Sequence, residues 1–414
     1  MQNAFEYRQG RLCCEEVELQ QIAGREGTPC YVYSAAGILH AYTQYTSGLA
    51  GIPHRICYAV KANGNLGVLR LLARAGAGFD IVSGGELFRV LKAGGDPAAV
   101  VFSGVGKTRE EIEYALSQGI HSFNCESEAE IALISALAVR LGKTASIAVR
   151  VNPDVDPVTH PYISTGLKEN KFGISISEVQ GVYERAATLP GLALDGVSCH
   201  IGSQLLDAAP LLEAAEKVLR LVDALRAKGL PIRVLDLGGG LGVPYRAGDP
   251  RPDVPGFLAQ LKAMAAGRDL FLVLEPGRSI VAESGALLAR VLYRKKNGGK
   301  EFIIVDASMA ELIRPALYEA YHEILPLRES RFGAIQADVV GPVCESSDFL
   351  AAGREVAGVL PGDTVAAMTC GAYGFVMASN YNARPRPCEV LVEGSSWTVV
   401  RRRETLADLV RGEE

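Results

Sequence analysis

The residues with the clearest chemical potential stand at the ends of apolar, strand-like runs. Lys61 directly follows one such run, residues 55–60. A lysine in this place is commonly solvated or salt-bridged, but an apolar strand can desolvate its ammonium group and thereby favour the free amine. A free amine forms a Schiff base with an aldehyde. Lys61 is therefore a candidate for holding a carbonyl cofactor.

Two later runs end in groups that a phosphorylated pyridine aldehyde would need. Residues 238–240 are consecutive glycines, which make a tight turn and also let backbone N–H groups approach a phosphate. Glu275 begins the segment EPGR (275–278). A carboxylate there serves as an ion-pair partner, or it keeps a pyridine nitrogen protonated and makes the ring an electron sink. Together with Lys61, these features predict a site for pyridoxal 5'-phosphate (PLP).

Eight strand-like runs must position these side chains, and they alternate with segments of helical period. This order predicts parallel strands joined by crossover helices, and eight such units in about 250 residues are typical of a TIM barrel. A doubly wound sheet is the structural alternative. In a TIM barrel the catalytic groups lie at the carboxyl ends of the strands. The predicted strands are 55–62, 78–83, 99–104, 121–127, 145–153, 194–202, 233–240 and 270–277.

The pattern changes after the barrel region, where paired strand-like runs surround short turns. The turns 297–299 and 394–395 are rich in glycine, which predicts antiparallel hairpins. The N-terminal segment also carries strand-like runs, too few to be stable alone. We therefore expect an α/β chain: a PLP-binding (β/α)8 TIM barrel over residues 35–280, and a mainly antiparallel β domain, similar to a β-sandwich or Greek-key barrel, formed by 1–34 and 281–414.

Composition narrows the classes of function. The net charge of -5 offers no positive field for nucleic acid or an anionic membrane surface. No run of about 18 apolar residues occurs, and segment 1–17 is polar and acidic, unlike a secretory signal. Nine cysteines are too few and odd in number for a disulfide framework, and the six histidines do not fall at metal-ligand spacing. We expect a cytoplasmic protein with reduced thiols, no metal, and no nucleic-acid or membrane partner.

Eight segments, in order along nearly the whole chain, carry a family resemblance. They are YAVKAN (58–63), HPYISTGLKENKFGI (160–174), SCHIGSQ (198–204), LDLGGGLG (235–242), EPGRSIV (275–281), ASMAELIRPALYEAYHEI (307–324), GPVCESSDFL (341–350) and GAYGFVMASNYNARPRP (371–387). In them the chain resembles the diaminopimelate decarboxylases, which are PLP-dependent members of the alanine racemase-like barrel family, as ornithine and arginine decarboxylases are. The resemblance implies a PLP barrel, a C-terminal β domain and a homodimer whose active sites are completed across the interface.

The resemblance also implies roles for individual residues. The implied cofactor ligands are Lys61 as the Schiff-base lysine, His200 on the ring face, Glu275 at the pyridine nitrogen, Ser203, Gly240, Pro276, Gly277 and Arg278 around the phosphate, and Tyr373. The implied substrate ligands are Arg278, Arg314, Tyr318 and Tyr373, with Glu345 for the remote ammonium group. Cys344 is the implied proton donor, and the implied catalytic set is Lys61, His200, Glu275 and Cys344. In this family the partner subunit supplies Cys344 and Tyr373.

The expected reaction is decarboxylation of meso-2,6-diaminopimelate to L-lysine and carbon dioxide, the last step of lysine biosynthesis. A pocket for this substrate binds a carboxylate, usually by arginine, and a remote ammonium group, usually by an acid; Arg314 and Glu345 supply these charges. Taken without the surrounding motifs, Arg314 is better explained as a surface ion-pair residue and Cys344 as a small buried apolar residue. The nearest alternative function is a sister decarboxylase of a carboxynorspermidine or siderophore precursor. A non-catalytic binding relative and an amino-acid racemase are further alternatives.

Overall fold

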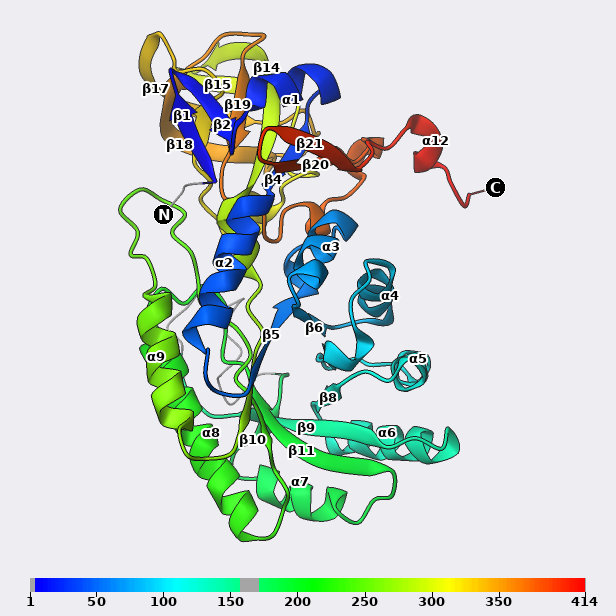
Figure 1. The fold of residues 1–414 in the computed structure, drawn as a ribbon. Coiled ribbons are helices and arrows are strands. Elements are labelled where there is room, and N and C mark those ends of the chain that lie inside the picture. Colours follow the sequence, from blue (N-terminus) through cyan, green and yellow to red (C-terminus); the bar gives the residue numbers. More distant parts are fainter. Residues whose placement is uncertain (1–3, 157–170, 414) are drawn as a thin grey trace. The chain divides into compact units, whose positions relative to one another are not determined.

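The computed structural model of the protein describes residues 4–156 and 171–413 (Figure 1). Residues 160–170 of the segment HPYISTGLKENKFGI lie outside this part of the chain. The chain divides into two compact units. We call Ala41–Val243 with Pro250–Ser279 the barrel unit, and Met1–His40 with Pro244–Asp249 and Ile280–Glu414 the β unit.

The barrel unit contains all eight of the predicted parallel strands. They are β5 (His54–Ala59), β6 (Gly78–Ile81), β7 (Val100–Phe102), β8 (Ser122–Cys125), β9 (Ala145–Asn152), β11 (Leu192–Cys199), β12 (Val234–Asp236) and β13 (Phe271–Leu274). They pair in the order β9, β11, β12, β13, β5, β6, β7, β8, and β8 pairs again with β9. This last pairing closes the ring and confirms the TIM barrel. A two-residue strand, β10 (Ile174–Ser175), pairs with β9.

Helices alternate with these strands along the chain. Local sequence signals mark the start of several of them: at the start of α5, Thr108 Oγ1 accepts the Glu111 N–H (3.3 Å), and the Glu111 carboxylate accepts the Thr108 N–H (3.0 Å). Helices α8 and α9 lie side by side (Figure 1). The barrel helices are α3 (Leu66–Arg74), α4 (Gly84–Lys92), α5 (Arg109–Gln118), α6 (Glu128–Arg140), α7 (Val179–Ala186), α8 (Ala209–Ala227) and α9 (Val254–Ala265); α2 (Ala35–Gly48) and α10 (Arg278–Val281) run across the unit boundaries.

The β unit is built on a mainly antiparallel sheet with the strand order β18, β17, β15, β14, β4, β20, β21. Its strands are β4 (Cys30–Ser34), β14 (Gly285–Asn297), β15 (Lys300–Val305), β17 (Phe332–Val340), β18 (Phe349–Gly358), β20 (Cys388–Glu393) and β21 (Ser396–Arg401), while β16 (Ile324–Pro326) pairs with β19 (Thr364–Ala367), which pairs with β14. The N-terminal β4 lies between β14 and β20. A second, small sheet holds β1 (Phe5–Arg8), β2 (Arg11–Cys14) and β3 (Val17–Glu18), and the helices are α1 (Leu19–Glu26), α11 (Arg314–Tyr318) and α12 (Leu406–Leu409).

Within residues 4–156 and 171–413, none of the helices has the length and apolar character that crossing a bilayer requires. The apolar side chains instead pack into cores within each unit. In the β unit, one such cluster joins residues from β4, β14 and β20, which include Val32, Leu288 and Val390. The N-terminal, middle and C-terminal parts of the chain therefore share one core.

One irregularity interrupts the barrel wall. The register between β9 and β11 shifts between Leu194 and Gly196, so that the ladder loses its regular bonds there. Tyr183 of α7 is buried, and its hydroxyl donates to Gly196 O and accepts the Val149 N–H (3.2 Å). A side chain thus replaces the missing backbone partners at the bulge.

The change Tyr183→Phe should lower the free energy of unfolding by about 1–3 kcal/mol, because it leaves a buried carbonyl and a buried N–H without partners. Chemical unfolding of the two proteins measures the difference. The matched control is Tyr293→Phe, since that ring is 66% exposed. Equal stabilities of Tyr183→Phe and the wild-type protein would show that the bulge does not need the hydroxyl.

Candidate active site

Lys61 lies in the 3-10 turn Val60–Ala62, directly after β5 and at the carboxyl end of the barrel. Its Nζ donates to Oδ2 of Asp80 in β6. The Asp80 side chain is 0% exposed, whereas 35% of the Lys61 side chain is exposed. The other oxygen, Asp80 Oδ1, is buried and has no hydrogen-bond partner in the described part of the chain. Lys61 is therefore held as an ammonium group beside a carboxylate with spare acceptor capacity.

Glu275 follows β13 and belongs to a buried polar cluster. Its Oε1 accepts hydrogen bonds from Asn124 Nδ2 (3.2 Å) and Ser103 Oγ (3.3 Å). Asn124 Nδ2 also donates to Asp236 Oδ2 (2.8 Å). Burial raises the pKa of Glu275 well above its ordinary range, and the negative charges of Asp236 and Asp80 raise it further. Glu275 therefore retains a proton that it can share with a base placed beside it.

His200 follows β11, and its ring is held in one tautomer. Its Nδ1 accepts the Gly239 N–H (3.3 Å), so the proton of the neutral ring is on Nε2. Burial lowers the pKa of His200 well below its ordinary range, and the positive charges of Arg150 and Lys61 lower it further. The imidazole is therefore a neutral, flat surface that can stack on an aromatic ring.

The glycine turn, Gly238–Gly240, is a place where backbone segments approach closely. A Cβ atom added to Gly239 would lie 2.3 Å from Glu275 O, and one added to Gly240 would lie 2.8 Å from Gly202 O. Gly238 and Gly240 also have positive φ angles of 62° and 128°, which favour glycine. Such a turn can bring backbone N–H groups within reach of a phosphate.

Ser203 and Arg278 meet at this end of the barrel. Nη2 and Nε of Arg278 lie 3.1 Å and 3.4 Å from Ser203 Oγ. Pro276 O accepts the Ala59 N–H (3.2 Å), and a Cβ atom added to Gly277 would lie 3.0 Å from the Ala59 Cβ. The EPGR segment is therefore packed against the end of the strand that precedes Lys61.

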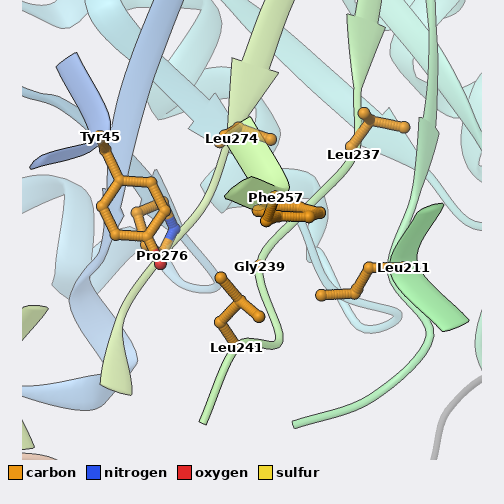
Figure 2. A pocket seen from close by; sticks show the side chains of 9 residues that line it. Tyr45, Leu211, Leu237, Gly239, Leu241, Phe257, Leu274 and Pro276 are labelled. Carbon is orange, nitrogen blue, oxygen red and sulfur yellow. The ribbon is translucent and has the colours of Figure 1, made fainter. Parts of the chain in front are cut away.

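A small apolar pocket lies against the glycine turn (Figure 2). Three helices contribute to it through Tyr45 of α2, Leu211 of α8 and Phe257 of α9. Its lining residues are Tyr45, Leu211, Leu237, Gly238, Gly239, Leu241, Phe257, Leu274 and Pro276. These lining side chains are mainly aliphatic and aromatic, so they support the glycine turn by packing against it.

The barrel residues fit a PLP molecule in the chemistry of their groups. Lys61 supplies a primary amine for the aldehyde, and Glu275 supplies a protonated carboxyl group for the pyridine nitrogen. Ser203 and Arg278 supply hydrogen-bond donors for the phosphate, and only glycine fits the close approaches of the neighbouring turn. The structure brings these predicted residues together at one end of the barrel unit.

In the β unit, Arg314 begins the short helix α11 and is only 6% exposed. Its Nη1 donates to the Tyr245 hydroxyl (3.0 Å) and to His322 Nε2 (3.0 Å). This burial excludes the interpretation of Arg314 as a surface ion-pair residue. Tyr318, which is half-buried, ends the same helix four residues later, so the two side chains share a helix face.

Cys344 and Glu345 lie in the loop between β17 and β18, and both are exposed. The Cys344 N–H donates to Asn382 Oδ1 (2.8 Å), and the carboxylate of the buried Asp348 accepts the Val343 N–H within the loop (2.7 Å). Cys344 is therefore not a small buried apolar residue. Tyr373 lies after β19 with a φ of 55°, which is uncommon for a residue other than glycine.

Sequence reasoning missed several polar residues of these two clusters. Asp80, Asn124 and Asp236 lie within predicted strands, and no functional role was predicted for them. A polar residue that interrupts an apolar run near its carboxyl end was the available signal. Tyr245 and His322 carried no such signal, because only the fold brings them to Arg314.

Comparison with known proteins places this geometry in a family. Residues 35–282 match the profile of the pyridoxal-dependent decarboxylase, pyridoxal binding domain. The chain is 56% identical to the diaminopimelate decarboxylase of Pseudomonas aeruginosa, over 99% of both chains. This chain belongs to the diaminopimelate decarboxylase family. A family member from Neisseria meningitidis is 50% identical over 97% of this chain and 98% of its own length.

Solved structures of this decarboxylase family agree with the fold. The diaminopimelate decarboxylase of Helicobacter pylori complexed with L-lysine has a TM-score of 0.92 and 44% sequence identity, over 96% of this chain and 99% of that chain. The diaminopimelate decarboxylase from m. jannaschii in co-complex with L-lysine has a TM-score of 0.94 and 38% identity, over 99% of this chain and 97% of that chain. The resemblance inferred from the sequence segments is thereby confirmed.

Replacing Glu275 should change how the stability of the cofactor-free decarboxylase depends on pH. In the unfolded chain Glu275 releases its proton at about pH 4.3, whereas in the folded protein it keeps the proton to higher pH. Because only the unfolded state then loses the proton, Glu275 makes the free energy of unfolding fall as the pH rises. The effect is at most about 1.4 kcal/mol per pH unit. The side chain introduced by Glu275→Gln has no proton to release, so we expect the stability of this variant, measured by urea unfolding, to depend less on pH than that of the wild type above about pH 5.

The control for this experiment is Glu355→Gln, since Glu355 is exposed in β18. The stability of this variant should depend on pH in the same way as that of the wild-type protein. A Glu275→Gln profile parallel to that of the wild type would mean that the Glu275 carboxyl group does not retain its proton in the folded protein.

Proposed function

We propose that this protein decarboxylates meso-2,6-diaminopimelate to L-lysine and carbon dioxide, the last step of lysine biosynthesis. The observation that carries this conclusion is the 56% identity to a diaminopimelate decarboxylase over 99% of both chains. The structures of relatives that are 44% and 38% identical contain L-lysine, the product of this reaction. The buried groups around Lys61 and Glu275 supply the matching chemistry.

When bound, PLP supplies an electron sink for the electron pair that remains on carbon when carbon dioxide leaves. We assign Lys61 Nζ to the cofactor aldehyde, because Lys61 directly follows β5 at the carboxyl end of the barrel. Glu275 holds a proton that suits a pyridine nitrogen, and the neutral His200 ring suits the cofactor face. The remaining proposed cofactor contacts are Ser203, Gly240, Pro276, Gly277 and Arg278 on the phosphate side, and Tyr373.

The charge requirements of the reaction decide which carboxylate the arginines bind. The carboxylate that leaves as carbon dioxide loses its negative charge, so a strong cationic contact to it would stabilise the ground state more than the transition state. We therefore assign the carboxylate that stays on lysine to Arg278, Arg314 and Tyr318, with Tyr373 as a further substrate contact. The carboxylate of Glu345 is assigned to the remote ammonium group. A sister decarboxylase whose substrate lacks a second carboxylate would leave the buried Arg314 without an anion.

Cys344 Sγ is assigned the delivery of a proton to the carbon that has lost carbon dioxide. A thiol can act as a general acid, and this one is exposed. The hydrogen bond from the Cys344 N–H to Asn382 Oδ1 (2.8 Å) fixes the backbone of the loop that carries it. Proton delivery by this loop would complete the reaction and leave L-lysine.

The proposal includes a homodimer in which the partner subunit supplies Cys344, Glu345 and Tyr373 to each site. The exposure of Cys344 and Glu345 in the single chain agrees with a role toward another subunit.

We also propose a cytoplasmic location for the protein. The proposed domain limits are 35–280 for the PLP barrel and 1–34 with 281–414 for the β domain.

The activity is tested by incubating the purified protein and PLP with meso-2,6-diaminopimelate. Lysine and carbon dioxide should form in equal amounts, and Lys61→Ala should abolish both, because the amine that holds the cofactor is lost. The control variant is Lys143→Ala, whose lysine is exposed and lies after α6. Release of carbon dioxide only from a carboxynorspermidine-type substrate, or formation of a D-amino acid without gas, would contradict the proposal.

Mixing two inactive variants tests the shared site. A dimer of one Lys61→Ala chain and one Cys344→Ala chain has one intact and one doubly defective site, if each site uses both chains. Random mixing makes half of the dimers mixed, so about a quarter of the wild-type activity should return. Mixing Lys61→Ala with the Lys61→Ala/Cys344→Ala double variant should restore nothing. Mixed dimers that form but remain inactive would place each site within a single chain.

A further inference from the structure

Arg314 is a buried cation that is held by neutral groups. Its side chain lies among buried residues, and it forms no ion pair with any residue in 4–156 or 171–413. The acceptors of its Nη1 group are the Tyr245 hydroxyl (3.0 Å) and His322 Nε2 (3.0 Å). Burying a guanidinium without an acid is costly unless an anion arrives to pair with it.

His322 can accept a hydrogen bond from Arg314 in only one tautomer. The ring is 0% exposed, and Nδ1 lies 2.8 Å from Met368 O, which can only accept. Nδ1 therefore carries the proton, and Nε2 presents its lone pair to Arg314 Nη1. The Cys370 sulfur lies 3.4 Å from the same Nδ1 atom and does not supply a competing charge.

Tyr245 holds the guanidinium from a second direction. The Arg314 Cζ atom lies 4.7 Å from the centre of the Tyr245 ring, a cation–π distance. The same ring meets the His322 ring edge-on, with centroids 5.4 Å apart and an interplanar angle of 83°. Arg314, Tyr245 and His322 therefore form one packed unit, which we call the arginine clamp.

The clamp leaves a defined part of Arg314 for a ligand. Both hydrogens of Nη1 have acceptors within the protein, so the Nε and Nη2 edge is the one that can bind a carboxylate through two parallel hydrogen bonds. A carboxylate in place of His322 would also orient the guanidinium, but it would cancel the charge that attracts the substrate. A neutral acceptor orients Arg314 and preserves its charge.

We propose that His322 is a positioning residue that sets the specificity for a substrate carboxylate, because its Nε2 lone pair orients Arg314. This inference rests on the proposed function, in which Arg314 binds the carboxylate that stays on lysine. It predicts that loss of the Nε2 acceptor weakens recognition of that carboxylate and leaves recognition of the rest of the molecule unchanged.

Two substitutions in the holoenzyme separate the two ring nitrogens. His322→Gln keeps an acceptor near the position of Nε2, whereas His322→Asn keeps a donor near Nδ1 and loses the acceptor for Arg314. For meso-2,6-diaminopimelate we expect His322→Asn to raise KM about 10-fold or more, with kcat within about 3-fold, as for loss of a hydrogen bond to a charged group. His322→Gln should keep KM within about 3-fold of the wild type.

Two inhibitors report on the carboxylate directly. L-lysine carries the retained carboxylate, and 1,5-diaminopentane has the same carbon chain and amines without it. His322→Asn should weaken inhibition by L-lysine by the same factor as it raises KM, and inhibition by 1,5-diaminopentane should stay unchanged. Equal losses with both inhibitors, or equal effects of Asn and Gln, would show a merely structural role and overturn the proposal.

Tyr245→Phe provides a second route if His322→Asn does not fold, because Tyr245 is partly exposed and only its hydroxyl is removed. It should also weaken L-lysine inhibition and spare 1,5-diaminopentane. A wild-type protein that forms no lysine would refute the proposed function itself. An active wild-type protein with unchanged L-lysine inhibition in His322→Asn or Tyr245→Phe would refute the clamp alone.

Discussion

The burial of three carboxyl groups at the mouth of the barrel is the constraint on which the other features of the site depend. Asp80, Asp236 and Glu275 interact away from water, where a negative charge on all three at once is unfavourable. The fold meets this constraint in three ways. Lys61 pairs with Asp80, Asn124 donates to both Asp236 and Glu275, and Glu275 keeps a proton. Two of these groups, Lys61 and Glu275, are the ones to which we assign contacts with PLP.

The arginine clamp of the β unit carries the opposite charge. There the Arg314 guanidinium is buried with neutral acceptors, so this cluster is positive. A substrate that carries amino groups and carboxylates needs both kinds of surroundings: a carboxylate-rich site for nitrogen chemistry and a cation for the carboxylate that must be retained. The two clusters of this chain are therefore complementary in charge, although each is built within its own unit.

Strand order and the main chemical groups could be predicted because they depend on local patterns. Apolar runs bounded by turn residues marked all eight barrel strands, and Lys61, Glu275 and the glycine turn stood out because each follows a strand. Asp80 and Asn124 lie inside strands, where alternation hides a polar side chain that points into the barrel. The burial of Arg314 could not be predicted, because a short IRPALYEA segment fits a surface helix equally well and only the tertiary fold brings Tyr245 to it. The contact of Tyr183 with the bulge between β9 and β11 was likewise hidden, because only the fold brings its hydroxyl to Gly196 O.

The contact between Lys61 and Asp80 also governs what the protein does before it meets its cofactor. An amine held as an ammonium ion beside a carboxylate has no lone pair to offer, so it is a poor nucleophile. Without the cofactor, the Lys61 amine is therefore less reactive toward an aldehyde than a neutral lysine amine would be. Only a molecule that binds the surrounding groups well enough to displace this ion pair can reach the amine. The contact that pairs the buried Asp80 carboxylate thus also lowers the reactivity of the Lys61 amine until the ion pair is displaced.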